Sequence, residues 1–329
     1  MSALRLESAW ALWIFALFQL SLAEPLLRQV PVVFSHDAAT GYLQPSIIKK
    51  AVYDWTITQV GSFDKQLDCG ARAFDLRLKL DKDGDVLMHH GDIPVNTKLK
   101  TAVDDVHNWL TSHPSELVLF VVADCSGDDC KQHAATVFTD AGIRVISCTE
   151  LASLTLSDAI TQGRLSAGGS ALAFVDFCTT GNYEPRITCY PPYKYSRSVD
   201  YAPVQNDESL MPTSGCYWNS SDQATAFHDM HLYLNRTSAV PFTSYAGFTS
   251  LQALWQETGE TVPQGILSAS SLIKDEERSE LNKNMLEKLQ AGWFPHINFF
   301  ELNNVCDHGL EIQAALKQRL ARMADDVAV

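Results

Sequence analysis

Short apolar runs alternate along this chain with longer stretches in which apolar residues recur at helical spacing. The runs predict eight strands, at residues 30–34, 73–78, 86–89, 117–123, 144–146, 171–177, 265–269 and 297–302. The helical stretches are residues 97–110, 276–289 and 310–323, and Pro114 ends the first of them. Eight strands interleaved with helices predict an α/β protein with a (β/α)8, TIM-barrel-like architecture. An open doubly wound sheet is the alternative, although no glycine-rich phosphate loop follows any strand.

The first 23 residues have the pattern of a secretory signal peptide. Residues 10–22 are apolar, and Ser21-Leu22-Ala23 is a small-residue cleavage site before Glu24. A membrane anchor is the alternative, but the uncharged run is short for a span. We therefore expect a secreted, extracellular protein. Residues 24–329 are expected to form one barrel domain, with a tyrosine- and proline-rich insertion at residues 179–222 on its rim.

Composition narrows the class of partner. The chain has 329 residues, 46% of them hydrophobic, and a formal net charge of −14, which argues against nucleic acid and against binding anionic membranes by bulk charge. All eight cysteines follow the signal segment, so disulfides are expected. Cys125 with Cys130 is the favoured local pair, and Cys178 with Cys189 is a second candidate. Asn219 and Asn235 begin glycosylation sequons.

The strand at residues 73–78 carries the most specific chemical signal. Residues two apart on a strand point to the same face, so Asp75 and Arg77 share a face opposite Phe74, Leu76 and Leu78. A parallel strand is normally apolar on both faces. The charged pair is therefore either a buried ion pair with no other role or part of a site at the barrel mouth, and the second interpretation is favoured.

Two histidines follow strands and are expected at the same mouth. His36 lies in Ser35-His36-Asp37, after the first apolar run, and His90 lies in Met88-His89-His90-Gly91. Glu301 lies within the last predicted strand, where a carboxylate needs a partner and a histidine could supply one. Two histidines beside an arginine are what acid–base cleavage of a phosphodiester needs, because one takes a proton, one gives a proton and the arginine neutralises the phosphate.

These residues resemble the X-domain family of phosphatidylinositol-specific phospholipases C, in particular the small metal-independent type. The resemblance is clear over residues 34–123 and rests on five stretches: Ser35-His36-Asp37, residues 55–59, residues 67–77, His89-His90-Gly91 and Pro114-Ser115-Glu116. It implies a barrel of the phospholipase C-like phosphodiesterase fold. It also implies a phosphoric diester hydrolase that acts on a phospholipid at a membrane surface, works as a monomer and needs no cofactor.

The resemblance also implies roles for individual residues. His36 would be the general base, His90 the general acid, and Arg77 would bind the phosphate oxygens where metal-dependent relatives hold a calcium ion. Asp37 and Asp75 would orient or polarise these three groups.

Two further residues receive roles from the same resemblance. Glu301 would replace the carboxylate on the last strand that holds His36. Trp55 would lie on the rim helix that touches the membrane.

Some features depart from the bacterial members of that family. Asp124 and Asp176 stand at strand ends where the bacterial enzymes look to have basic residues, so the inositol headgroup is less supported than the reaction class. A metal-dependent relative, similar to glycerophosphodiesterases or sphingomyelinase D and using Ca²⁺ or Mg²⁺, is a first alternative. A non-catalytic lipid-binding protein is a second.

Overall fold

The computed structural model describes residues 24–44, 50–176, 178, 214–215, 235, 238–239, 247–254, 266 and 269–326. The strands are β1 (Val32–Ser35), β2 (Ala73–Leu80), β3 (Val86–His90), β4 (Ile93–Lys98), β5 (Leu117–Ser126), β6 (Arg144–Val145), β7 (Ser170–Phe174), β8 (Ser214–Gly215), β9 (Ser250–Ala253) and β10 (Phe299–Leu302). The α-helices are α2 (Lys50–Asp54), α3 (Phe63–Asp68), α4 (Leu99–Ser112), α5 (Cys130–Asp140), α6 (Cys148–Leu151), α7 (Leu156–Gln162), α10 (Leu272–Ser279), α11 (Leu281–Gln290) and α12 (Gly309–Asp326). Short 3₁₀ turns are η1 (Leu27–Gln29) and η2 (Ala38–Tyr42).

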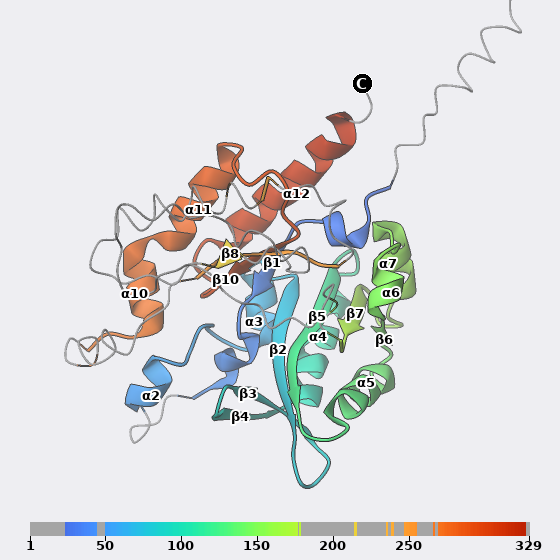
Figure 1. Cartoon of the computed structure of the whole chain (residues 1–329), viewed down its shortest axis with the longest axis vertical. Helices are drawn as coiled ribbons and strands as arrows, with labels where there is room; N and C mark the ends of the chain where they lie inside the picture. The colour runs from blue at the N-terminus through green and yellow to red at the C-terminus, as the bar shows by residue number, and fades with distance from the viewer. Residues whose placement is uncertain are drawn as a thin grey trace, which may run out of the picture.

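Eight of the strands form one parallel sheet in the order β6-β7-β5-β2-β1-β10-β9-β8 (Figure 1). Among the described residues the edge strands β6 and β8 do not pair, so the sheet is curved but not closed. The predicted α/β class is confirmed. One expectation is corrected: β3 is not a member of the parallel series but pairs antiparallel with β2 and with β4, because the turn after β2 folds the chain straight back.

The second half of the chain departs from the expected elements at two places. The strand expected at residues 265–269 falls mostly outside the described residues, Ile266 is helical, and the strand beside β10 is β9. The single helix expected at residues 276–289 is instead two helices, α10 and α11. They meet at Glu280, whose φ of 54° is left-handed and interrupts the helical hydrogen bonding.

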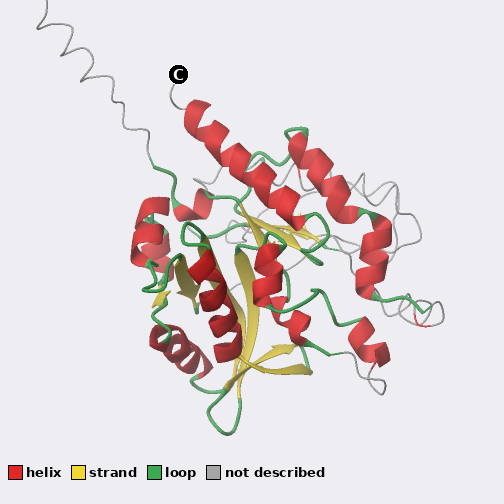
Figure 2. Ribbon diagram, turned by 180° about the vertical axis from the view of Figure 1, so that it is seen from behind, coloured by secondary structure: helices red, strands yellow, loops and turns green. Residues whose placement is uncertain are grey.

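Strand alternation creates two apolar cores, one on each face of the sheet. The outer face, with Val33, Phe74 and Phe300, packs against helices α3, α4, α5, α11 and α12. In Figure 2 helices lie in front of the sheet. The inner face carries a separate cluster of buried residues that includes Phe34 and Phe299, whose rings stack 4.6 Å apart. Each such ring contributes about 1.5–3 kcal/mol by leaving water. The inner cluster is the floor on which the polar residues farther along the same strands lie.

Three disulfides join described cysteines. Cys125–Cys130 confirms the favoured local pair. Cys178 bonds Cys148, not Cys189, because β7 ends beside the start of α6. The third, between Cys69 and Cys306, joins residues 237 positions apart.

The predicted signal segment at residues 1–23 and Cys189 lie outside the described residues, as does the predicted insertion at residues 179–222 apart from β8. Within the described part of the chain, no helix has the length and apolar character needed to cross a bilayer.

Candidate active site

The site is built at the carboxyl end of β1, above the inner apolar cluster. His36 directly follows β1 and is 4% exposed. Asp37, 3% exposed, has a left-handed φ of 44°, which turns the chain sharply into η2. Its backbone N–H donates to Asp75 Oδ2 at 3.0 Å. A positive φ in a buried aspartate carries a backbone cost that surrounding contacts must offset, and such residues concentrate at functional sites.

The Asp37 carboxylate contacts the arginine and both histidines of the site. Arg77 Nε lies 2.6 Å from Asp37 Oδ1, and His90 Nε2 lies 2.9 Å from Asp37 Oδ2. The same Oδ2 is 3.2 Å from His36 Nε2. Arg77 also reaches Asp75 Oδ2, with Nη2 at 3.4 Å. The five residues that the sequence placed together, His36, Asp37, Asp75, Arg77 and His90, therefore do lie together.

Exposure within this cluster is graded. His36 and the two carboxylates are buried, whereas the side chains of Arg77 and His90 are 32% and 28% exposed. The arginine and the second histidine thus line the open side, where a substrate can meet them. This arrangement can place one phosphate against a guanidinium and two imidazoles at once.

The ring of His36 has a second partner that the sequence did not indicate. Its Nδ1 lies 2.8 Å from Oδ1 of Asn303, which is the residue directly after β10. With the amide oxygen assigned there, Nδ1–H is the donor. The Nε2 lone pair of neutral His36 then faces Arg77, whose Nη2 is 3.5 Å away. Nε2 is therefore the nitrogen available to accept a proton.

Charges around the buried pair shift both pKa values. Burial lowers the pKa of His36, but the negative charges of Asp37, Glu301 and Asp75 outweigh burial and the opposing charge of Arg77, so the net shift is upward. Burial raises the pKa of Asp37, but the neighbouring His36 and Arg77 charges outweigh it and hold that pKa well below its usual range. Asp37 is therefore a stable anion at neutral pH.

Glu301 lies on the inner face of β10 but hydrogen-bonds other groups than expected. Its Oε2 accepts from Ser250 Oγ at 2.5 Å and from Gln252 Nε2 at 2.8 Å, both on β9. Burial raises its pKa, opposed by the charge of His36 and by these two hydrogen bonds. The expectation that Glu301 holds His36 is corrected, because Asn303 occupies that position. Glu301 acts on His36 only through its charge.

The ends of β1 and β10 are tied together by a buried glutamine. Gln59 Nε2 donates to the main-chain oxygens of His36 and Leu302, and its Oε1 accepts from the N–H of Val305. Residues 303 and 304 are thereby fixed between two anchored positions.

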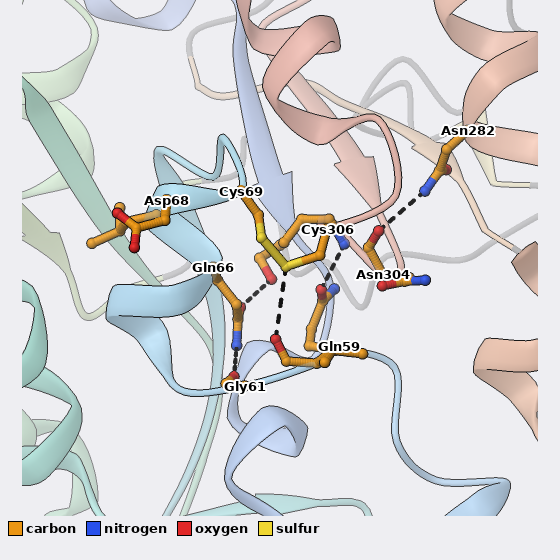
Figure 3. Close-up of a disulfide and its surroundings, with 12 residues drawn as sticks. Gln59, Gly61, Gln66, Asp68, Cys69, Asn282, Asn304 and Cys306 are labelled. Carbon is orange, nitrogen blue, oxygen red and sulfur yellow. Dashed lines mark hydrogen bonds between the residues drawn. A yellow bond between two sulfur atoms is a disulfide. The ribbon is translucent and has the colours of Figure 1, made fainter.

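A disulfide and a second amide side chain extend this support, as Figure 3 shows. Cys69–Cys306 covalently joins the residue after α3 to the turn that follows Asn304. Asn282 Nδ2 on α11 donates to the main-chain oxygens of Asn303 and Asn304. The segment that carries the Asn303 amide is thus held from both sides.

A cation site can be tested against the donors present. His36, Asp37 and Asp75 each offer a ligand atom within 4.8 Å of the others. However, the Arg77 guanidinium already contacts both carboxylates and supplies positive charge at that point. These residues therefore fit a metal-free site better than a divalent ion.

The remaining predicted residues lie outside this cluster. Trp55 directly follows α2 and is partly buried, close in sequence to the exposed apolar side chains of Val52 and Val60. Asn235 is partly buried, and its Oδ1 accepts from the N–H of Phe294. Asn219 lies outside the described residues.

Comparisons with known proteins agree with the resemblance in the sequence. The chain is 34% identical over 93 residues to PI-PLC X domain-containing protein 1 of Danio rerio, and 33% identical over 76 residues to PI-PLC X domain-containing protein 2 of Homo sapiens. It is 27% identical over 105 residues to a 1-phosphatidylinositol phosphodiesterase of Staphylococcus aureus. These matches cover 27%, 22% and 32% of this chain and 29%, 24% and 32% of the three relatives. No protein-family model matches the chain.

Solved structures extend the likeness to nearly the whole chain. The phosphatidylinositol-specific phospholipase C of Listeria monocytogenes aligns with a TM-score of 0.50 over 92% of this chain and 96% of its own, at 13% identity. A mutant of the Staphylococcus aureus enzyme aligns with a TM-score of 0.54 over 85% and 88%, at 12% identity. The likeness confirms the expected α/β fold of the TIM-barrel-like, phospholipase C type, with a sheet that the described strands leave open.

Proposed function

We propose that this protein is a phosphoric diester hydrolase that cleaves the headgroup of a phospholipid, with phosphatidylinositol-like lipids as the leading class. One observation carries the proposal: His36 and His90 both approach Asp37 Oδ2, within 3.2 Å and 2.9 Å, beside the Arg77 guanidinium. The partial similarity to phosphatidylinositol phosphodiesterases supports the same reaction class.

The proposed reaction is an intramolecular transfer at phosphorus. His36 Nε2 takes the proton of a headgroup hydroxyl, whose oxygen attacks the phosphorus. The bond from phosphorus to the diacylglycerol oxygen breaks, and His90 protonates that oxygen as it leaves. The products are diacylglycerol and a cyclic phosphodiester of the headgroup, which water can open when the two histidines exchange roles.

Electrostatics assists at two points. Arg77 neutralises the charge that builds on the non-bridging phosphate oxygens in the transition state. Asp37 stays ionised and stabilises the imidazolium forms of His36 and His90 in turn. In this proposal the enzyme needs no metal or other cofactor.

The setting of the reaction is also a proposal. The partly buried Trp55, directly after α2, would offer an apolar contact for a membrane surface together with the exposed Val52 and Val60. The signal-like segment and the three disulfides support secretion. We also propose that the protein is a monomer with glycans at Asn219 and Asn235.

A metal-dependent diesterase is the second candidate, favoured by the spacing of donor atoms among His36, Asp37 and Asp75. The presence of Arg77 ranks it lower. In that case EDTA would abolish turnover, and Ca²⁺ or Mg²⁺ would restore it.

The test is hydrolysis of mixed-phospholipid vesicles in EDTA by the wild type and by His36→Ala, His90→Ala and Arg77→Ala. His107→Ala, a change on the surface helix α4, is the matched control. We expect the wild type and the control to release diacylglycerol and a phosphorylated headgroup, and the three site variants to lose about a hundredfold or more. Activity equal to the wild type in His36→Ala would exclude the mechanism. Vesicle binding without turnover would leave a lipid-binding protein.

A further inference from the structure

A buried glutamine side chain uses all of its hydrogen-bonding groups on main-chain atoms at the end of the sheet. Gln59 is fully buried, and its Nε2 donates to the main-chain oxygens of His36 at 3.0 Å and of Leu302 at 2.8 Å. Its Oε1 accepts from the N–H of Val305 at 3.0 Å. An amide side chain has two N–H donors and one oxygen acceptor, so each of these groups has a partner. Figure 3 shows Gln59 beside the segment that carries Cys306.

The partners of Gln59 lie at the point where two neighbouring strands end. Ser35 pairs with Leu302 in the β1–β10 ladder, and the N–H of His36 donates to the main-chain oxygen of Leu302 at 3.1 Å. Beyond that bond the two chains continue into η2 and into the segment that carries Asn303, and strand pairing no longer sets the distance between them. Gln59 connects the two chains at this level.

Two threonines hold the glutamine in place. The backbone N–H groups of Thr58 and Gln59 both donate to Thr40 Oγ1, at 3.1 Å and 3.2 Å. Thr58 Oγ1 donates to the main-chain oxygen of His36 at 3.0 Å, and the main-chain oxygen of Thr58 accepts from the N–H of Asn304 at 2.7 Å. Residues 58 and 59 therefore contact both the residue that carries the imidazole and the segment that follows β10.

Two acceptors compete for the single ring proton of neutral His36. Asn303 Oδ1 lies 2.8 Å from Nδ1, and Asp37 Oδ2 lies 3.2 Å from Nε2. A charged acceptor binds an N–H more strongly than a neutral amide does, although Asp37 Oδ2 is shared with His90. A proton on Nε2 would leave that nitrogen unable to accept one from a substrate. The Nδ1–H form therefore depends on the contact to Asn303 staying short and well aligned.

We propose that Gln59, supported by Thr58, is a positioning residue that keeps neutral His36 in the Nδ1–H tautomer. It fixes the distance between His36 and the segment that carries Asn303, so that the amide oxygen stays aligned with Nδ1. Gln59 acts through main-chain atoms and does not need to touch the imidazole or the substrate. The proposal rests on the phosphodiesterase function proposed above, in which His36 Nε2 takes the proton of a headgroup hydroxyl.

The test measures the tautomer directly. Protein labelled with ¹⁵N in its histidines is studied by NMR at a pH where His36 is neutral, because the two ring nitrogens have different shifts in the two tautomers. The His36 signals are identified by their loss in His36→Gln. At the same pH, kcat/KM is measured in the vesicle hydrolysis assay.

Two variants weaken the support to different extents. Gln59→Met keeps the length of the side chain and removes all three of its hydrogen bonds. Thr58→Val keeps the shape of the side chain and removes the hydroxyl that donates to the main-chain oxygen of His36, so it is the milder change.

Gln66→Met is the matched control, because it makes the same substitution at a second fully buried glutamine. Gln66 also forms three hydrogen bonds, but these connect it to Ser35 Oγ and to the main-chain oxygens of Ala38 and Gly61. The control should therefore unfold at a lower urea concentration without a change in the His36 tautomer.

We expect a single Nδ1–H tautomer in the wild type and the control, and mixed tautomers in Gln59→Met. In that variant kcat/KM should fall about three- to tenfold, and at least by the factor by which the Nδ1–H population falls, because the Nε2–H form cannot act as the base. Thr58→Val should change both quantities in the same direction by a smaller factor.

A single Nδ1–H tautomer in folded Gln59→Met would overturn the proposal, because the glutamine would then support only the stability of the fold. An Nε2–H tautomer in the wild type would overturn it as well, and so would mixed tautomers in Gln66→Met. If Gln59→Met does not fold, Thr58→Val decides, and an unchanged tautomer there overturns the proposal. If the wild type cleaves no lipid, the proposed function fails, while the tautomers still show whether Gln59 positions His36.

Discussion

The hydrogen bond between His36 and Asn303 gives the sharpest prediction about the base. His36 can accept a proton only when neutral, so activity should rise with pH through its pKa. The structure raises that pKa, with Asp37 and Glu301 outweighing burial, so the acid limb of kcat/KM should lie above the ordinary histidine value of about 6.5. Asn303→Asp would add a negative charge where the amide oxygen now lies, 2.8 Å from Nδ1.

The size of the effect follows from that distance. An opposite charge this close typically moves a pKa by about 1–3 units in favour of the charged form. The acid limb should therefore move up by at least about one pH unit, and kcat/KM near pH 6 should fall about tenfold. The plateau at high pH should change little, because an aspartate still accepts from Nδ1–H.

Asn303→Leu tests the orientation of the His36 proton without adding a charge. It removes the acceptor, so neutral His36 can also carry its proton on Nε2, where it cannot act as a base. We expect the plateau to fall about tenfold to a hundredfold, and ¹⁵N spectra of the imidazole to show mixed tautomers.

Asn298→Leu is the matched control for this pair of variants. Asn298 precedes β10, and its Nδ2 donates to the main-chain oxygens of Leu27 and Val30. The control should lose about 1–3 kcal/mol of stability without moving the acid limb. An acid limb that stays in place in Asn303→Asp would refute the reasoning, as would a single Nδ1–H tautomer in Asn303→Leu.

Two further predictions test the phosphate site and the covalent frame. Arg77→Lys keeps the charge but loses the planar fork that spans Asp37 and the phosphate, so kcat should fall about tenfold or more in the vesicle hydrolysis assay. An unchanged kcat would show that charge alone suffices. Replacing both cysteines of Cys69–Cys306 by alanine removes a cross-link between residues 237 positions apart and should lower the free energy of unfolding in urea by up to about 5 kcal/mol. The same change at Cys125–Cys130, whose cysteines are five positions apart, should lower it by about 2 kcal/mol. The reverse order would contradict the loop-entropy argument.

Local patterns in the sequence were sufficient for much of the site. Period-two alternation predicted that Asp75 and Arg77 share one face of β2. In the structure Arg77 contacts the Asp37 carboxylate, and Asp75 accepts a hydrogen bond from the Asp37 backbone N–H. The end of the first apolar run located His36. The helix at residues 97–110 begins only at Leu99, because the two residues before it finish β4. These features depend on neighbours a few residues away, which a sequence displays directly.

Long-range pairing was the part that the sequence could not supply. Cysteine spacing gave Cys125–Cys130, whose partners are five residues apart, and missed Cys69–Cys306, whose partners are 237 residues apart in the sequence. Nothing in the local pattern of residues 250–253 identified β9, since a four-residue strand with polar inner positions has little apolar signal.

The misplacement of Glu301 shows where alternation stops being informative. Glu301 and Asn303 are two residues apart and share the inner face, so the pattern alone favours neither as the partner of His36. The choice depends on register: β1 and β10 align Phe34 with Glu301, which brings His36 level with Asn303. Alternation fixes which face a residue occupies, whereas register fixes its height above the apolar floor. A buried carboxylate one layer below the base can bias its pKa through space, while an amide at its own level fixes which nitrogen holds the proton. The proposed base therefore depends on one residue of β10 and one residue directly after it for two different properties.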